Sequence, residues 1–151
     1  MTKPQVNIQN RKATFEYELL EEYIAGMQLL GTEIKSIRQN KASITESFCQ
    51  MKDGELYIIN MYISKYELGT HANHPPRRER KLLLKRKELL KIERKLKESG
   101  LTIIPKILFI NEKGYAKLQI FLAKGKKLHD KRESIRKKDI DREYKRVLKY
   151  Q

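Results

Sequence analysis

The stretch from residue 101 to residue 122, LTIIPKILFINEKGYAKLQIFL, decides the fold class because it predicts two antiparallel strands. Residues 115–122 alternate between two faces, and one face is formed by Ala116, Leu118, Ile120 and Leu122. A polar turn at 111–114 separates this strand from the one at 101–110. Pro105 has no amide hydrogen to donate, so we expect an edge position or a bulge there.

A second hairpin is predicted upstream, with strands at 47–52 and 55–64. The dipeptide Asp53-Gly54 joins them, and Asp-Gly between two strand-like runs is typical of a tight hairpin turn. A short strand is predicted at 27–30. The chain is therefore expected to contain five or six antiparallel strands.

Three helices are expected to accompany the strands. Two are short, at 15–22 and at 33–38, the latter with Thr32 as its N-cap. The third is a long helix over 77–98, because its leucines and isoleucines, all but Leu84, fall on about half of the helix circumference. Gly100 ends it.

Together these elements predict an α+β domain that is mainly β. A small antiparallel barrel of the oligonucleotide-binding type, with flanking helices, has the right size and number of strands. An open sheet with one helix-covered face is the alternative. We expect the barrel domain to span 1–122 and a flexible, basic C-terminal tail to span 123–151.

The net charge of +15, from 34 basic and 19 acidic residues, is concentrated in two segments. Residues 77–98 hold 11 basic and 4 acidic residues, and residues 123–151 hold 12 and 5, so each segment carries +7. A polyanion such as RNA is the partner that this pattern favours, because neutralised phosphates release condensed counterions. A surface adapted for solubility and an anionic membrane surface are the two alternatives.

The remaining sequence favours a cytoplasmic protein without catalytic chemistry. No apolar stretch approaches the roughly 20 residues of a membrane span, and the N-terminus lacks an apolar leader. The single cysteine, Cys49, reads as an inert thiol within a strand. His71 and His74 do not fill a metal shell. We therefore predict no enzyme activity, no cofactor and no metal; an RNA-processing enzyme with hidden carboxylates is the contrary hypothesis.

The tail shows a helical pattern of its own. Ile140, Tyr144, Val147 and Leu148 are spaced as one face of a helix. Isolated helices of about 12–15 residues are marginal in water, so we expect this segment to fold only on a partner. Docking on the protein's own core is the alternative.

Six sequence blocks resemble one family, the SsrA-binding proteins, or small protein B, of bacterial trans-translation. The blocks are Asn10-Arg11-Lys12-Ala13, Tyr23-Ile24-Ala25-Gly26, Leu30-Gly31-Thr32-Glu33-Ile34-Lys35-Ser36-Ile37-Arg38, Pro76-x-Arg78-x-Arg80-Lys81-Leu82-Leu83-Leu84, Leu122-Ala123-Lys124-Gly125-Lys126-Lys127 and Asp130-Lys131-Arg132-Glu133. Lys85 and His74 depart from the family's usual residues.

The resemblance implies an RNA-binding adaptor of ribosome rescue, acting as a monomer. It would bind the tRNA-like domain of transfer-messenger RNA and, with elongation factor Tu and GTP, enter the A site of a stalled ribosome. The tail would probe the empty mRNA channel and contact small-subunit rRNA at the decoding centre. A generic ribosomal or RNA-binding protein of the same fold is the alternative.

The resemblance also implies which residues contact RNA. By motif position, the candidates for transfer-messenger RNA are Glu33, Lys35, Arg38, Arg80, Lys81, Lys124, Lys126 and Lys127. Glu33 cannot bind phosphate, so we expect it to accept hydrogen bonds from a base, a ribose or a neighbouring Lys or Arg. The ribosome-contacting residues of the tail are expected to be Asp130, Lys131, Arg132, Tyr144, Lys145, Arg146 and Leu148.

Overall fold

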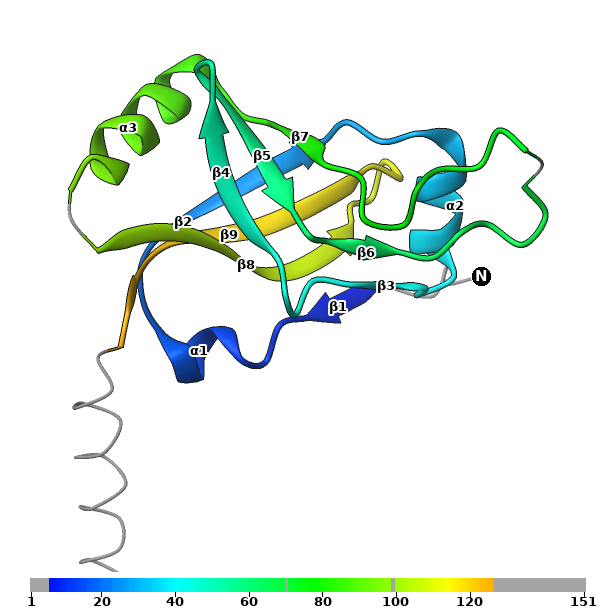
Figure 1. The fold of residues 1–151 in the computed structure, drawn as a ribbon, viewed down its shortest axis with the longest axis horizontal. Coiled ribbons are helices and arrows are strands. Elements are labelled where there is room, and N and C mark those ends of the chain that lie inside the picture. The colour runs from blue at the N-terminus through cyan, green and yellow to red at the C-terminus, as the bar shows by residue number, and fades with distance from the viewer. Residues whose placement is uncertain (1–5, 70, 99, 127–151) are drawn as a thin grey trace, which may run out of the picture.

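A computed structural model describes residues 6–69, 71–98 and 100–126, and over these ranges the chain folds around one antiparallel sheet. The strands of this sheet, in spatial order, are β1 (Asn7–Gln9), β8 (Leu101–Ile110), β4 (Phe48–Lys52), β5 (Glu55–Ile59), β7 (Arg80–Leu83), β2 (Tyr17–Met27) and β9 (Ala116–Gly125). Pairing of β8 with β9 closes the ring (Figure 1). The predicted barrel is therefore confirmed.

A two-stranded ribbon and three helices complete the fold. The ribbon pairs β3 (Ala42–Ser43) with β6 (Tyr62–Ile63), and the helices are α1 (Ala13–Glu16), α2 (Gly31–Arg38) and α3 (Arg86–Leu96). Helices α2 and α3 lie at different ends of the molecule (Figure 1). The helix predicted at 33–38 is confirmed, but Thr32 lies inside it and does not act as its N-cap.

Both predicted hairpins are present. In the β4–β5 turn, Asp53 and Gly54 have φ values of 51° and 80°, the left-handed conformation that a two-residue turn requires. Along the β8–β9 pair the register shifts between Pro105 and Ile107, which is the bulge expected from the proline. Strand β9 continues to Gly125, three residues beyond the expected domain boundary at 122.

The long helix predicted at 77–98 is wrong in its first half. Residues 80–83 form β7, which pairs with β5 and β2, and only 86–96 are helical. Arg80 and Leu82 are buried while Leu83 is exposed, so the burial alternates with a period of two. The run of leucines is compatible with a helix and with a strand. Hydrogen-bonded pairing with β5 on one side and β2 on the other favours the strand.

The helix predicted at 15–22 is wrong for a similar reason. Helix α1 ends at Glu16, and β2 begins at Tyr17 and pairs with β9 over almost its whole length. Tyr23 and Ala25 point into the barrel, whereas Glu22 and Ile24 are exposed. Of the strand predicted at 27–30, only Met27 belongs to a strand.

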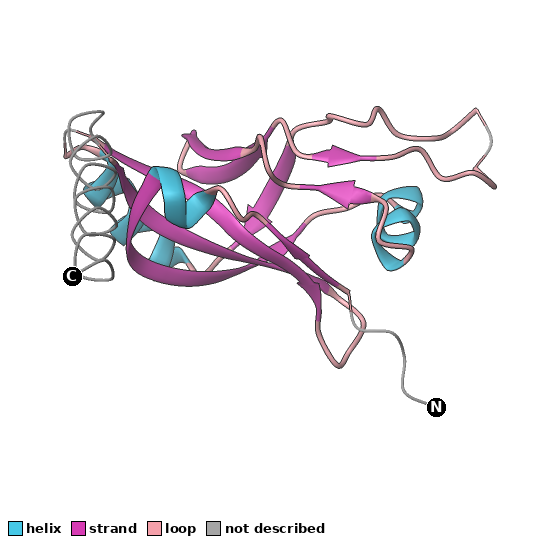
Figure 2. Ribbon diagram, turned by 90° about the horizontal axis from the view of Figure 1, so that it is seen from below, coloured by secondary structure: helices cyan, strands magenta, loops and turns pink. Residues whose placement is uncertain are grey.

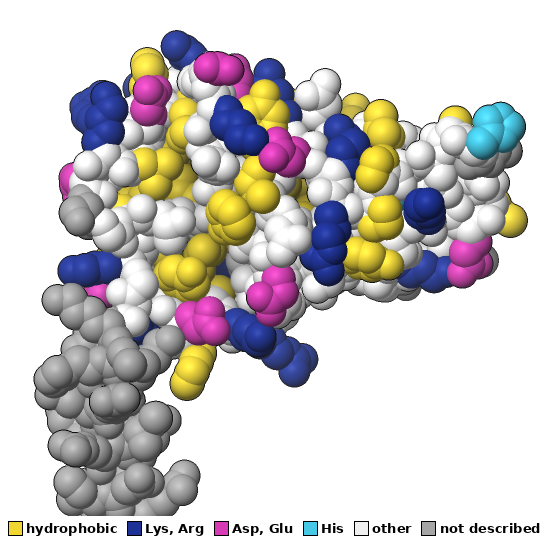
Figure 3. Space-filling view, viewed as in Figure 1, with side chains coloured by type: hydrophobic (Ala, Val, Ile, Leu, Met, Phe, Trp, Pro, Cys, Tyr) yellow, Lys and Arg dark blue, Asp and Glu magenta, His cyan; other side chains and the backbone are white. Residues whose placement is uncertain are grey.

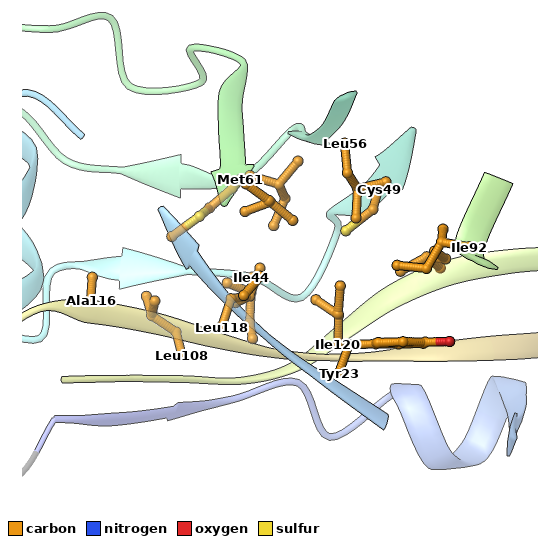
Figure 4. Close-up of a cluster of buried hydrophobic side chains, with 14 of the residues drawn as sticks. Tyr23, Ile44, Cys49, Leu56, Met61, Ile92, Leu108, Ala116, Leu118 and Ile120 are labelled. Atoms are coloured by element: carbon orange, nitrogen blue, oxygen red, sulfur yellow. The ribbon is translucent and has the colours of Figure 1, made fainter. Parts of the chain in front are cut away.

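The core fills the barrel and extends beneath α2 and α3. Ile58, Leu118 and Ile120 contribute from the strands, while Ile92 enters from α3 and Ile37 from α2. Figure 4 shows the aliphatic side chains meeting between the opposing strands. Each such side chain is worth roughly 1.5–3 kcal/mol when fully buried. The barrel is thus a packed core without a central cavity for a ligand.

A buried ion pair fastens α2 to β7. The Glu33 side chain of α2 and the Arg80 side chain of β7 are both fully buried, and Arg80 Nε donates to Glu33 Oε2. The other Arg80 nitrogens donate to the carbonyl oxygens of Met61, at 2.6 Å, and Pro76, at 3.0 Å. Every terminal group of Arg80 therefore has an internal partner.

The Glu33 carboxylate is equally well satisfied. Its Oε1 accepts hydrogen bonds from the Leu30 amide, at 2.9 Å, and from Arg78 Nη2, at 2.6 Å. Burial alone raises the pKa of Glu33, but the hydrogen bonds from Arg78, Leu30 and Arg80 outweigh it and leave the pKa below its ordinary value. Burial likewise lowers the pKa of Arg80, and Glu33 opposes that change.

Replacing Glu33 by glutamine should lower the free energy of unfolding by about 3–5 kcal/mol, because the substitution leaves the Arg80 charge buried and uncompensated. Urea unfolding measured at neutral pH tests this. The control is Glu46→Gln, which removes an exposed carboxylate paired with Lys12 at 3.1 Å and should leave the unfolding midpoint unchanged. Equal losses in the two variants would contradict the assigned role of the buried pair.

The advantage of wild type over Glu33→Gln should also disappear in acid. The folded chain holds the Glu33 pKa below 4.5, so the carboxylate stabilises the fold fully above that pH and progressively less as the pH falls through the lowered pKa. Unfolding curves of both proteins between pH 7 and pH 3 measure the difference. A difference that stays constant over this range would refute the assignment to Glu33.

Candidate nucleic-acid interface

The first group of basic side chains, called here the α2 patch, consists of Lys35, Arg38 and Arg78. Lys35 and Arg38 are exposed on α2, and the Lys35 ammonium lies 5.4 Å from the ring centroid of Tyr66. The Arg78 side chain is 32% exposed and is held by Glu33 from below. Three cations thus reach solvent from α2 and from the chain segment packed against it.

The second group, called here the β9-end patch, consists of Lys12, Lys124 and Lys126. Lys124 is exposed at the end of β9, opposite Glu18 of β2. The Lys126 amide donates to the Glu16 carbonyl at 3.0 Å, and its Nζ donates to the Thr14 carbonyl at 3.1 Å. These bonds attach Lys126 to α1, so the motif after β9 is anchored to the barrel.

The two patches lie at opposite ends of the molecule. Helix α2 and the end of β9 are separated by the length of the barrel in both ribbon views (Figures 1 and 2). On the face shown in Figure 3, basic side chains are spread among acidic and apolar ones, without one continuous basic surface. The sequence prediction treated these residues as one set, and the structure divides the set in two.

The other predicted contact residues lie elsewhere. Glu33 and Arg80 are fully buried, so their charged groups do not face solvent. Glu33 was expected to accept hydrogen bonds from a base, a ribose or a neighbouring Lys or Arg, and in the structure its donors include Arg78 and Arg80. Lys81 lies on β7 and belongs to neither patch, with its Nζ 3.8 Å from a Glu55 carboxylate oxygen. Outside the described residues lie Lys127, Asp130, Lys131, Arg132, Tyr144, Lys145, Arg146 and Leu148.

Sequence reasoning left Arg78 out of the contact set, although it stands in the same motif as Arg80. The motif Pro76-x-Arg78-x-Arg80, which contains both arginines, was the available signal. That signal was missed because the segment was assigned to a helix.

Two side chains of types common in catalytic sites have structural contacts here. His74 is buried, with Nδ1 2.9 Å from the Thr32 hydroxyl and Nε2 3.0 Å from the Ile63 carbonyl, so both ring nitrogens connect the 64–79 loop to its neighbours. Burial raises the pKa of the Cys49 thiol, as expected of an inert cysteine. Among the described residues, no three His, Cys, Asp or Glu side chains gather as a metal site would require.

The tyrosines differ in their availability for stacking. Tyr23 is buried, and burial together with its hydrogen bond to Glu21 raises its pKa to about 12. Tyr115 is 65% exposed and Tyr62 is 38% exposed, with the Arg77 guanidinium 5.5 Å from the Tyr62 ring centroid.

No helix within 6–69, 71–98 or 100–126 is long and apolar enough to cross a membrane.

Two bacterial proteins are similar in sequence to this chain over nearly its whole length. An SsrA-binding protein of Christiangramia forsetii is 56% identical over 147 residues, which cover 97% of this chain and 94% of that protein. One of Bacteroides thetaiotaomicron is 56% identical over 149 residues, covering 99% of each.

Solved structures and family models lead to the same group. A chain of the structure called "tmRNA-SmpB: a journey to the center of the bacterial ribosome" is 47% identical and superposes with a TM-score of 0.70, covering 87% of this chain and 95% of that one. The family model described as SmpB protein matches residues 7–150. The chain therefore belongs to the SmpB protein family.

Proposed function

We propose that this protein is an RNA-binding adaptor of trans-translation. It binds the tRNA-like domain of transfer-messenger RNA and delivers it to the A site of a stalled ribosome. The relatives named SsrA-binding protein and the likeness to a chain solved with transfer-messenger RNA support this proposal. The observation that carries it is the closed barrel with two separate basic patches, since an adaptor has to contact two RNA surfaces at once.

The proposed contacts follow the exposure of the side chains. Lys35, Arg38 and Lys81 contact RNA from the α2 side of the barrel, and Lys124, Lys126 and Lys127 contact it from the β9 end. The tail begins at that second end, because β9 finishes at Gly125. Asp130, Lys131 and Arg132, followed by Tyr144, Lys145, Arg146 and Leu148, are proposed to contact the small-subunit rRNA and the mRNA channel.

The proposed role is binding without chemistry, in the cytoplasm where ribosomes operate. Elongation factor Tu with GTP acts through the charged RNA and needs no site of its own on this chain. The barrel interior is filled by apolar side chains and therefore holds no catalytic carboxylates among the described residues. The alternative is a generic RNA-binding protein of the same fold. The two functions differ in whether transfer-messenger RNA is preferred over other RNAs.

Specific binding should be seen in a competition experiment at physiological salt. The labelled ligand is the tRNA-like domain of transfer-messenger RNA, and the competitors are unlabelled transfer-messenger RNA, elongator tRNA and an unrelated hairpin of equal length. We expect the first to compete at least tenfold better than the hairpin, because shape recognition adds to phosphate contacts. Equal competition by all three would establish the generic alternative.

RNA binding and ribosome rescue should be separable by truncation. Because Lys126 is bonded to α1, the cut belongs after Lys126, so that the barrel keeps its last anchored residue. The shortened protein is expected to bind transfer-messenger RNA within about threefold of wild type, since one or two phosphate contacts at most are lost. It should lose peptide tagging on stalled ribosomes in a purified translation system.

A matched full-length control carries Ala in place of Asp130, Lys131 and Arg132 only. Tagging by this variant should also fall while its RNA affinity is retained. Simultaneous loss of RNA binding and tagging on truncation would rule out the division into barrel and tail.

A further inference from the structure

The cluster around Glu33 contains one carboxylate and two guanidinium groups. Arg80 and Arg78 both donate to Glu33, one to each carboxylate oxygen. Arg80 alone neutralises the buried carboxylate, and each of its two terminal nitrogens donates to a backbone carbonyl, that of Met61 or that of Pro76. The cluster therefore carries a surplus of one positive charge, and that surplus belongs to Arg78.

Arg78 is the only member of the cluster that reaches solvent. Its side chain is 32% exposed, whereas those of Glu33 and Arg80 are fully buried. Its hydrogen bonds to the described residues all use Nη2, which donates to Glu33 Oε1 at 2.6 Å and to the Gln28 carbonyl at 3.5 Å. Its buried Nε has no hydrogen-bond partner among the described residues. The guanidinium thus has donor capacity that the fold leaves unused.

The backbone of Arg78 is fixed as well. Its amide donates to the Pro75 carbonyl at 3.3 Å, and the Pro76 carbonyl accepts both from Arg80 Nη2, at 3.0 Å, and from the Ile63 amide, at 2.9 Å. Arg78 is therefore held at its backbone and at one end of its guanidinium. An arginine fixed in this way loses less conformational freedom on binding than a free surface arginine does.

We propose that Arg78 is an anion-binding residue that takes a phosphodiester group of RNA, and that Glu33 and Arg80 are positioning residues for it. This inference deepens the proposed function and rests on it. The planar guanidinium suits the paired oxygens of a phosphate, and a charge-assisted bond of this kind is stronger than a neutral one. Glu33 acts from inside the fold: it holds Nη2, and because Nε is buried, Nη1 is the terminal donor that is left for the ligand.

A purely structural role for Arg78 does not explain the arrangement. Glu33 keeps the Leu30 amide and Arg80 as partners when Arg78 is removed, so the buried carboxylate remains compensated. The capping contact of α2 is kept for the same reason. Arg78 is therefore dispensable for the ion pair, and its value lies in what it presents to solvent.

The test compares Arg78→Gln with Arg77→Gln. Both variants lose one positive charge, one residue apart, but Arg77 donates to the Asn60 carbonyl and side-chain oxygens and lies against Tyr62, away from Glu33. Affinity for full-length transfer-messenger RNA is measured over a range of salt concentrations, and thermal unfolding is followed for each protein.

For Arg78→Gln we expect a loss of affinity of about tenfold or more, a decrease of about one in the slope of log K against log salt, and a melting temperature that falls much less than that of Glu33→Gln. Arg77→Gln should bind within about twofold of wild type. Arg78→Lys, which keeps the charge but cannot span Glu33 and a phosphate, should restore the salt slope and only part of the affinity.

Three results would overturn the inference. One is an Arg78→Gln variant that binds as wild type but melts at lower temperature, which would make Arg78 structural. Another is an equal loss of RNA affinity in the Arg78 and Arg77 variants, which would indicate non-specific electrostatic attraction between basic side chains and RNA. The third is normal binding of transfer-messenger RNA with defective tagging, which would show that Arg78 acts at a later step than the binding of this RNA. A wild-type chain that fails to bind transfer-messenger RNA overturns the proposed function together with this inference.

Discussion

The buried charge of Glu33 is the constraint on which much of the remaining structure depends. A carboxylate taken out of water costs several kcal/mol unless a cation and further hydrogen bonds compensate it. Arg80 supplies the cation, and Arg80 in turn needs the carbonyls of Met61 and Pro76. One ion pair therefore couples α2, β7, the end of the 55–63 region and the start of the 76–80 segment. An apolar contact is not directional enough to set so many backbone positions at once.

This coupling explains how a short strand is able to close the barrel. Strand β7 has only four residues, yet it bridges β5 and β2, and the ring is open without it. Leu82 contributes apolar burial, but a run of leucines would satisfy burial in more than one register. Arg80 resolves that ambiguity, because a shift by one residue would turn its guanidinium away from Glu33 and out of the interior.

The sequence was sufficient wherever local chemistry agreed with the final structure. The hairpin at Asp53-Gly54, the bulge at Pro105 and the barrel class all follow from turn geometry and alternation. Prediction failed at 80–83, where Leu82 and Leu83 fit a helical and a strand pattern equally. Only the long-range pairing with β5 and β2 decides between them, and that pairing is invisible to a local window. Glu33 was singled out as an RNA-contacting residue, and its burial depends on a partner 47 residues away that a local window does not show.

The position of the charge matters more to function than its amount. Two basic segments of equal net charge would be interchangeable if the protein were only a polycation, yet the barrel places their described parts differently. The first segment contains the buried Arg80, the partly exposed Arg78 and helix α3. Part of its positive charge therefore lies inside the fold, where Glu33 neutralises it. The second leaves the barrel from an anchored lysine on the side opposite α2. A rigid body with a cationic site at each end can bridge two RNA surfaces only if their separation matches its length. Under the proposed function the barrel is a spacer, and its stability, which depends on Glu33 and Arg80, would maintain that separation.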